Sequence, residues 1–487
     1  MSQARQNSQD QDGNGTGPAD VSRTMSLDSN AAPSAASDAA STGYRHSVEP
    51  ARPLGSAGNA GMFSIPEYSR PPSDYESSTG SSGTQIDDRN RYFHSRRVRP
   101  GEVEKPWLEK TNPKEKWVTI LPVLAIVIGL IGSGFLVWDG VRSVVKNKYC
   151  PVLDENFSGG LDSKIWTKEV EVGGYGNGQF EQTTNTDENV YINNSRLVIK
   201  ATLQDAKLMD KNNVINLLKD GSCTSKVWSN CVAATNMTAG NNSVVPPVRS
   251  GRINTKKGAT IKYGRIEVTA KLPHGDWLWP AIWMLPVKST YGPWPRSGEI
   301  DIIESRGNNW TYFQGGNDIV SSALHWGPNS ANDGWWKTNN KRRALHTTYS
   351  AGFNMFGLEW SQKYLFTYVN TRLLQVTYTN FKKPMWKRGG FPDVDQNGTR
   401  LTDPWSATGD INAPFDQEFY LIINLAVGAT NGWFEDGKSD KPWYDNSPRA
   451  KRDFWDARDQ WYPTWTQPQV EVSRVVMMQQ CNGNEEL

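Results

Sequence analysis

Three carboxylates, Glu299, Asp301 and Glu304, lie within an otherwise apolar segment that reads PRSGEIDIIESR. Glu-Ile-Asp-Ile has the period of two of a half-buried strand, so the first two acids point to one face and the isoleucines to the other. Glu304 breaks this alternation, because an odd offset from Glu299 sends it to the apolar side. A single β-bulge between Asp301 and Glu304 would bring all three acids to the same face.

Acids that share one face of a strand suit the cleavage of a glycosidic bond. Like charges at close range raise one another's pKa values. A retaining glycosidase needs one ionised carboxylate as nucleophile and one protonated carboxyl as acid, about 5 to 5.5 Å apart. The intervening aspartate could hydrogen-bond the nucleophile. A solvated edge strand that carries charges is the alternative interpretation of the same segment.

The motif EIDIIE, with WPAIWMLP upstream of it, resembles the active-site strand of glycoside hydrolase family 16 in its laminarinase-like branch. This branch includes endo-1,3-β-glucanases and β-glucan-recognition proteins. The resemblance extends over nearly all of the chain from about Leu153 to Met478. Its further motifs are LPHGDWLWPAIWMLP before the acids, and FNMFGLEW, PFDQEFYLIINLAVG and TNGWFEDG after them.

The resemblance implies roles for individual residues. Glu299 matches the nucleophile, Asp301 its helper and Glu304 the acid/base. Tryptophan rings beside glycosidase acids form walls for sugars, whose C–H groups stack on aromatic faces, although core packing is the alternative. Trp283 matches the position against the sugar at the cleavage point. Further candidates for substrate binding are Trp279, His325, Arg306, Asn177 and Trp433.

No cofactor is expected. Members of the family can bind a structural calcium ion on the convex face. The C-terminal ligand position is here Glu471 rather than the usual aspartate. That departure weakens the expectation of a metal.

Short apolar runs separated by turn residues follow Cys150, and no long helical period intervenes. This pattern predicts an all-β, antiparallel sandwich rather than an α/β fold. The resemblance makes it a β-jelly roll of two curved sheets with a cleft across the concave one. Two stretches, 205–248 and 382–410, are predicted to be loops inserted into that frame.

The rest of the chain differs in composition. Residues 1–88 are rich in small and polar residues and cannot bury enough apolar surface to fold, so we expect disorder there. The tail, taken as 1–116, ends in a basic segment. With 53 basic and 51 acidic side chains, the charge balance gives no reason to expect binding to nucleic acid. The sequence gives no indication of an oligomeric state.

Residues 117–138 carry no charge and are long enough for one membrane-spanning helix. Tryptophans lie at both ends, and more lysines and arginines precede the segment than follow it. We therefore expect a signal-anchor, type II protein whose N-terminus is cytosolic. The catalytic domain, residues 150–487, would be lumenal or extracellular.

Cysteines and glycosylation sequons agree with that orientation. All four cysteines follow the apolar segment, which favours two disulfides in an exported domain. Close spacing favours Cys223 with Cys231 and leaves Cys150 for Cys481; a zinc site is the alternative. One N-x-S/T sequon, at Asn14, precedes the segment, and those after it are Asn156, Asn193, Asn236, Asn241, Asn309 and Asn397.

These observations predict a membrane-anchored enzyme that acts on β-1,3-linked or mixed-linkage β-glucan, as in a fungal cell wall. Hydrolysis and transglycosylation share the same covalent intermediate and remain alternatives. A protein that only recognises β-glucan is a second hypothesis, because TNGWFEDG also resembles relatives that have lost the acids. A receptor with a signalling tail is a third.

Overall fold

The computed structural model describes residues 97–109, 112–143, 147–210, 213–236, 243–395, 397–407 and 409–481. The chain divides into two compact units, 1–110 and 111–487. In the first unit, the described residues include helix α1, Pro106–Glu109. The predicted disorder of residues 1–88 and the sequons at Asn14 and Asn241 lie outside the described residues.

Helix α2, Glu115–Ser143, contains the whole apolar segment predicted at 117–138. Its window Glu115–Val141 has a mean hydropathy of 2.6, and none of it is buried against the rest of the protein. By length and composition it is a candidate membrane span. Pro122 lies inside the helix without ending it.

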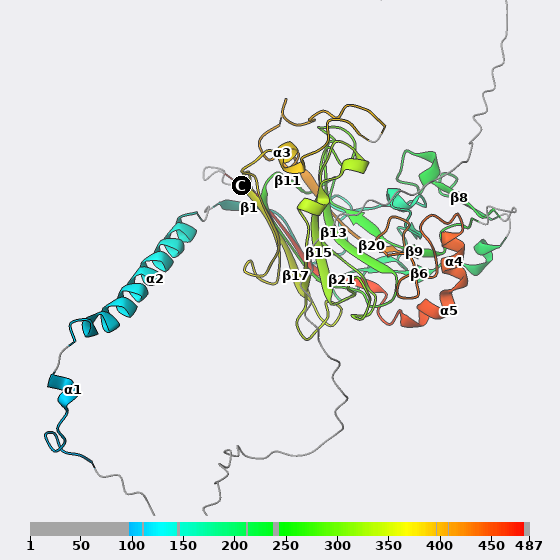
Figure 1. Ribbon diagram of the computed structural model, residues 1–487. Coiled ribbons are helices and arrows are strands. Elements are labelled where there is room, and N and C mark those ends of the chain that lie inside the picture. The colour runs from blue at the N-terminus through cyan, green and yellow to red at the C-terminus, as the bar shows by residue number, and fades with distance from the viewer. Residues whose placement is uncertain are drawn as a thin grey trace, which may run out of the picture. The chain divides into compact units, whose positions relative to one another are not determined.

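Two antiparallel sheets of eight strands each form the C-terminal part of the chain, after α2 (Figure 1). Sheet A has the order β19-β18-β17-β12-β21-β5-β4, and β1 also pairs with β21. Its long last strand, β21, therefore lies at the centre. The strands of sheet A are β1 Lys148–Glu155, β4 Val190–Ile192, β5 Leu197–Lys200, β12 Gly264–Lys271, β17 Asn354–Trp360, β18 Tyr364–Val369, β19 Gln375–Asn380 and β21 Gln469–Cys481.

Sheet B has the order β16-β15-β14-β13-β20-β10-β2, and β11 also pairs with β20. The central strands β14, β13 and β20 contain the three motifs that carry the acids, the tryptophans and FYLIINLAV. The strands of sheet B are β2 Thr167–Lys168, β10 Arg252–Asn254, β11 Thr260–Ile261, β13 Leu278–Pro286, β14 Glu299–Ser305, β15 Ile319–His325, β16 Asn340–Arg343 and β20 Phe419–Val427.

One apolar cluster joins the two sheets. Sheet A contributes alternate residues such as Ile266 and Val268 of β12, and sheet B contributes Leu421 and Ile423 of β20. All four side chains are fully buried. Alternation along each strand places the intervening side chains on the outer faces. The protein thus has the all-β jelly-roll fold that was predicted.

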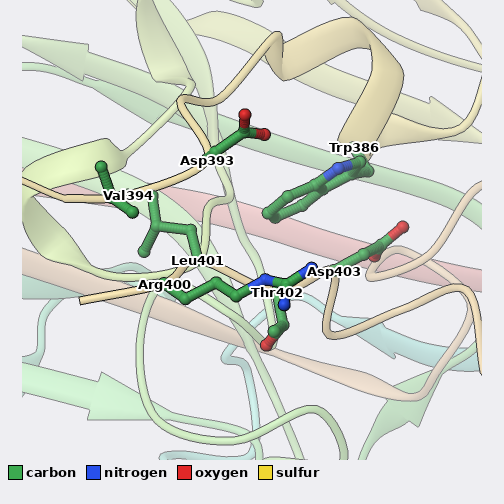
Figure 2. A pocket seen from close by; sticks show the side chains of 7 residues that line it. All are labelled: Trp386, Asp393, Val394, Arg400, Leu401, Thr402 and Asp403. Atoms are coloured by element: carbon green, nitrogen blue, oxygen red, sulfur yellow. The ribbon is translucent and has the colours of Figure 1, made fainter. Parts of the chain in front are cut away.

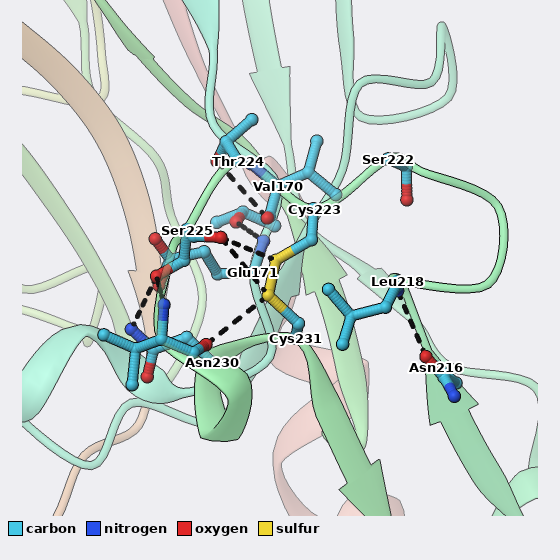
Figure 3. The surroundings of a disulfide bond; sticks show 12 residues. Val170, Glu171, Asn216, Leu218, Ser222, Cys223, Thr224, Ser225, Asn230 and Cys231 are labelled. Carbon is cyan, nitrogen blue, oxygen red and sulfur yellow. Dashed lines mark hydrogen bonds between the residues drawn. A yellow bond between two sulfur atoms is a disulfide. The ribbon is translucent and has the colours of Figure 1, made fainter. Parts of the chain in front are cut away.

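The predicted insertion at 205–248 contains regular structure of its own. Strands β7, Val214–Asn216, and β8, Val232–Ala234, form a two-stranded sheet. The disulfide between Cys223 and Cys231 closes the turn between them, as Figure 3 shows. A separate three-stranded sheet contains β3 Glu181–Thr183, β6 Thr202–Leu203 and β9 Val248–Ser250.

Short helices lie in the connections of the domain. The second predicted insertion, 382–410, contains helix α3, Met385–Gly389. Helices α4, Ala450–Asp456, and α5, Arg458–Trp461, follow each other shortly before β21.

The second disulfide, between Cys150 and Cys481, ties the beginning of β1 to the end of β21. Both predicted pairings are thus confirmed, and the zinc alternative is wrong because all four thiols are bonded to sulfur. Disulfides together with an exposed apolar helix are features of a secreted or extracellular domain.

The two disulfides should differ in their effect on stability. The Cys150–Cys481 bond closes a loop with a sequence separation of 331, against 8 for Cys223–Cys231. Because a cross-link constrains the unfolded chain more when its loop is longer, Cys150→Ser with Cys481→Ser should cost about 2–4 kcal/mol of unfolding free energy. Differential scanning calorimetry would measure it, with Cys223→Ser and Cys231→Ser as the matched control. An equal or larger loss in the control would contradict the expectation.

Candidate active site

The predicted bulge lies in β14 between Asp301 and Glu304. In the pairing of β14 with β15, Asp301 is opposite Ala323 and Glu304 is opposite Ser321, so the register shifts by one residue. The pairing with β13 shifts at the same place. The bulge leaves both intervening isoleucines, Ile302 and Ile303, fully buried in the core. All three acids therefore lie on the outer face of sheet B.

The first two acids meet a histidine from the next strand. Glu299 pairs with His325 across β14 and β15. Ligand atoms of Glu299, Asp301 and His325 lie within 4.8 Å of one another. Nε2 of His325 is 3.2 Å from Oδ2 of Asp301, and its Nδ1 is 2.5 Å from Oδ2 of Asp333. The imidazole is thus held between two carboxylates, and the indole N–H of Trp294 donates to Glu299 at 2.8 Å.

The third acid is held from the other side by tryptophans. The indole N–H of Trp279 donates to Oε1 of Glu304 at 3.0 Å. The ring of Trp279 stacks on Trp433, with ring centres 4.7 Å apart. The guanidinium of Arg306 donates two hydrogen bonds to the carbonyl oxygen of Trp433, at 3.1 and 2.6 Å, and lies 4.0 Å from its ring centre. Each of four predicted site residues thus contacts the next, in the order Glu304, Trp279, Trp433 and Arg306.

Burial and like charge raise the pKa values of both glutamates. Burial, and then the charge of Asp301, raise the pKa of Glu299 well above its ordinary value, and His325 acts against this shift. The same two causes raise the pKa of Glu304 to about 8, while His325 and the hydrogen bond from Trp279 lower it. Because its raised pKa lies above 7, Glu304 keeps its proton at neutral pH, as a general acid must.

His325 supplies the positive charge next to these acids. Burial alone would lower its pKa, but the interactions with Asp301 and then Asp333 raise the pKa well above 6.5. The imidazole is therefore charged at neutral pH. Since the pKa is higher in the folded protein than in the unfolded chain, this pairing stabilises the fold below about pH 6.5. Its contribution is lost as the pH rises through the raised value.

The last two predicted residues, Trp283 and Asn177, make their hydrogen bonds with groups other than the acids. Trp283 is opposite Asp301 in the β13–β14 pairing, and its indole N–H donates to Asn424 at 2.7 Å. The backbone carbonyl of Asn177 accepts from the N–H of Thr430, at the start of the loop that carries Trp433. Asn177 therefore belongs to the support of that loop in this structure.

Sequence reasoning missed several residues of the site. Asp333, Asn424 and Trp335 were not proposed, and Trp335 lies 6.3 Å from His325, ring to ring. Asn424 had a detectable signal, because it is the single amide in the apolar run FYLIINLAV. Trp277, which neighbours the predicted wall, is a core residue with 2% of its surface exposed.

One pocket lies away from the acids. A pocket of about 620 Å³ lies in the second insertion and is lined by residues such as Trp386, Asp393 and Arg400 (Figure 2). None of the predicted site residues lines it. Contacts between the insertion and the site region include Trp405, whose indole N–H donates to the carbonyl of Arg296, and Phe391, whose ring packs against Trp326.

Glu471, the expected C-terminal calcium ligand, contacts two side chains of the protein. Its Oε2 is 3.3 Å from a guanidinium nitrogen of Arg196, and its Oε1 accepts a hydrogen bond from Gln469.

Comparisons with known proteins identify the family. The family model "Glycosyl hydrolases family 16" matches residues 177–414. A β-1,3-glucan-binding protein of Penaeus monodon is 38% identical over 340 residues, which are 68% of this chain and 88% of that protein. The chain belongs to glycosyl hydrolase family 16. The residues that match the family model include all three acids, whereas Asn424 and Trp433 lie beyond them.

Other similar proteins are more distant. A glucan endo-1,3-β-glucosidase A1 of Niallia circulans is 29% identical over 292 residues, which are 57% of this chain and 33% of that protein. The solved catalytic domain of an endo-1,3-β-glucanase (laminarinase) from Thermotoga petrophila is 22% identical, with a TM-score of 0.44. The aligned region covers 69% of this chain and all of the solved domain.

The charge of His325 can be tested directly. Asp333→Asn removes one negative charge but keeps an oxygen that can accept from the backbone N–H of Trp326, as Oδ1 now does. The pKa of His325 should then fall, which NMR titration of the imidazole would measure. Asp318→Asn, which breaks an ion pair with Arg343 instead, is the control. An unchanged titration in Asp333→Asn would show that this carboxylate does not hold the charge.

Proposed function

We propose that this protein is a retaining glycosidase that hydrolyses or transglycosylates β-1,3-linked or mixed-linkage β-glucan. The observation that carries the proposal is the bulge in β14, which puts the carboxyls of Glu299, Asp301 and Glu304 on one face of sheet B. Two carboxyl groups of different protonation state on one surface are what a double displacement needs.

In the first step, an oxygen of Glu299 bonds to the anomeric carbon while the bond to the leaving oxygen breaks. The proton of Glu304 passes to that oxygen, and the N–H of Trp279 stabilises the carboxylate that remains. Glu299 must be ionised to attack. The charged imidazole of His325, whose ring nitrogen lies within 4.8 Å of the Glu299 carboxylate, favours that ionised form.

In the second step, Glu304 is a carboxylate and acts as general base. It takes a proton from water or from a sugar hydroxyl, whose oxygen attacks the anomeric carbon and breaks the ester to Glu299. Charged His325 stays beside Asp301 and Glu299 throughout and limits the repulsion between them. Two displacements return the β configuration.

The substrate class is supported by the relatives and by the aromatic residues. The Penaeus monodon protein is named for binding β-1,3-glucan, and the Niallia circulans enzyme for cleaving it. Trp283 is half-buried opposite Asp301, and Trp294 is 46% exposed while it donates to Glu299. Such rings offer faces on which sugar rings stack.

We also propose that α2 spans a membrane, with the N-terminus in the cytosol and the catalytic domain outside it. The excess of lysine and arginine before α2 supports this type II orientation, and so do the two disulfides after it. A wall glucan, as in fungi, would then be the local substrate. The two relatives compared by sequence are from an arthropod and a bacterium. The proposal of a fungal wall glucan as substrate therefore depends on the membrane-spanning role of α2.

Recognition of β-glucan without turnover is the second candidate. It is favoured by the name of the 38% identical relative, a β-1,3-glucan-binding protein. The two functions separate when the purified full chain is incubated with laminarin, lichenan, agarose and xyloglucan and the products are separated by size. Binding to laminarin without any shorter product would support recognition.

Substitution of Glu299 and substitution of Glu304 should reduce activity in different ways. Glu299→Ala should abolish turnover on every substrate, because no covalent intermediate can form. Glu304→Ala should form the intermediate only from an aryl glycoside with a good leaving group, and azide should then restore turnover and yield a β-glycosyl azide. Glu418→Ala, at an exposed carboxylate just before β20, is the control and should keep full activity.

Proton NMR early in the reaction gives the decisive outcome for the stereochemistry. A β-anomeric product is expected from the wild type. An α-anomeric product would rule out the retaining mechanism, and full activity in both glutamate variants would place the chemistry elsewhere.

Membrane orientation is tested separately. In sealed microsomes, added protease should remove the N-terminal tail and leave the domain after α2 intact, because the membrane protects it. Permeabilised microsomes are the control, in which both parts become accessible. Protection of the tail with loss of the domain would reverse the topology.

A further inference from the structure

A lysine whose side chain has no exposed surface lies within the loop that carries Trp433. This loop, residues 429–445, is called the Trp433 loop below. Nζ of Lys441 is 2.5 Å from Oδ1 of Asp436 and 2.5 Å from Oδ1 of Asp445. It also donates to the carbonyl of Phe434 at 2.8 Å. The three acceptors match the three N–H donors of an ammonium group.

The partners of Lys441 themselves bind the backbone of the Trp433 loop. The other oxygen of Asp445 accepts from the N–H of Gly432, directly before Trp433, at 2.7 Å. The N–H of Asp445 is 3.2 Å from both oxygens of Asp436. A buried ammonium is stable only while it is fully paired, so these groups must stay together. Lys441 thus closes the loop into one connected unit.

This unit reaches the general acid through two tryptophans. The loop places Trp433 against Trp279, and Trp279 donates to Glu304. Arg306 holds the carbonyl of Trp433 from below. Lys441 is therefore linked to Glu304 through Trp433 and Trp279.

We propose that Lys441 is a positioning residue for the general acid Glu304, because its buried ammonium holds the Trp433 loop in the conformation that presses Trp433 onto Trp279. This inference rests on the proposed glycosidase function. Lys441 itself touches neither Glu304 nor, on this view, the substrate. Loss of Lys441 should therefore change the positions of Trp433 and Trp279 beside Glu304 without removing a catalytic group.

Two kinetic quantities should change together. Without Lys441 the wall formed by Trp433 loosens, so KM for laminarin should rise roughly five- to tenfold. The hydrogen bond from Trp279, which lowers the pKa of Glu304, should weaken as its stacking partner moves. The basic limb of kcat/KM should then move to higher pH, by about half a unit.

The experiment compares Lys441→Met in the full chain with Lys438→Met. Lys438 lies in the same loop, carries the same charge and is exposed, so it controls for the loss of one positive charge. Asp436→Asn is the milder second variant in case Lys441→Met does not fold. The pH profile of kcat/KM, KM and kcat are measured for each, together with the melting temperature.

Combination with Trp433→Leu gives the sharpest test. If Lys441 acts through Trp433, adding Lys441→Met to Trp433→Leu should leave KM and the basic limb where Trp433→Leu alone puts them. A loss of kcat with unchanged KM and an unchanged basic limb would overturn the proposal, because it is what a smaller folded fraction produces. Additive shifts in the double variant would overturn it as well.

Failure of the proposed function would look different. If the wild type cleaves none of the glucans, the glycosidase proposal fails while the loop can still be examined by laminarin affinity. Lys441→Met should then weaken binding, Asp436→Asn should weaken it to a smaller extent, and Lys438→Met should leave it unchanged. Equal affinity in all the variants would overturn the role of Lys441 independently of catalysis.

Discussion

Negative charge that cannot be solvated is the constraint on which this site depends. Glu299, Asp301 and Glu304 come from one short strand and share one face, so ionising all of them at once is costly. The structure meets this cost in two ways. His325 is held charged between Asp301 and Asp333, and indole N–H groups bind the two glutamates.

The bulge in β14 links this constraint to the core of the sandwich. Two adjacent isoleucines, Ile302 and Ile303, enter the core together, and the residue after them emerges among the acids. Moving Glu304 to the other face would bury a carboxylate in the core and expose an isoleucine. Packing of sheet B against sheet A thus fixes the position of the proposed acid, so stability and geometry depend on the same two residues.

Much of the fold could be predicted because its signals are local. The apolar run at 419–427 became β20 with those bounds, and the broken alternation before Glu304 became the bulge. Cysteine spacing predicted both disulfides. The missed contacts join distant parts of the chain. Trp283 contacts Asn424 only because β13 lies beside β20. The order of strands in a sheet cannot be predicted from the sequence of one strand.

The position of β21 has a consequence for biosynthesis. This last strand of the chain lies between β12 and β5 and also pairs with β1, so sheet A has no continuous centre until it arrives. The disulfide between Cys481, the final residue of β21, and Cys150 in β1 then links these two strands covalently. A nascent chain that has been translated up to β20 therefore holds every proposed catalytic acid but only separate pieces of sheet A. Sheet A can therefore be completed only after β21 has been synthesised, and the unpaired strand edges stay exposed until then.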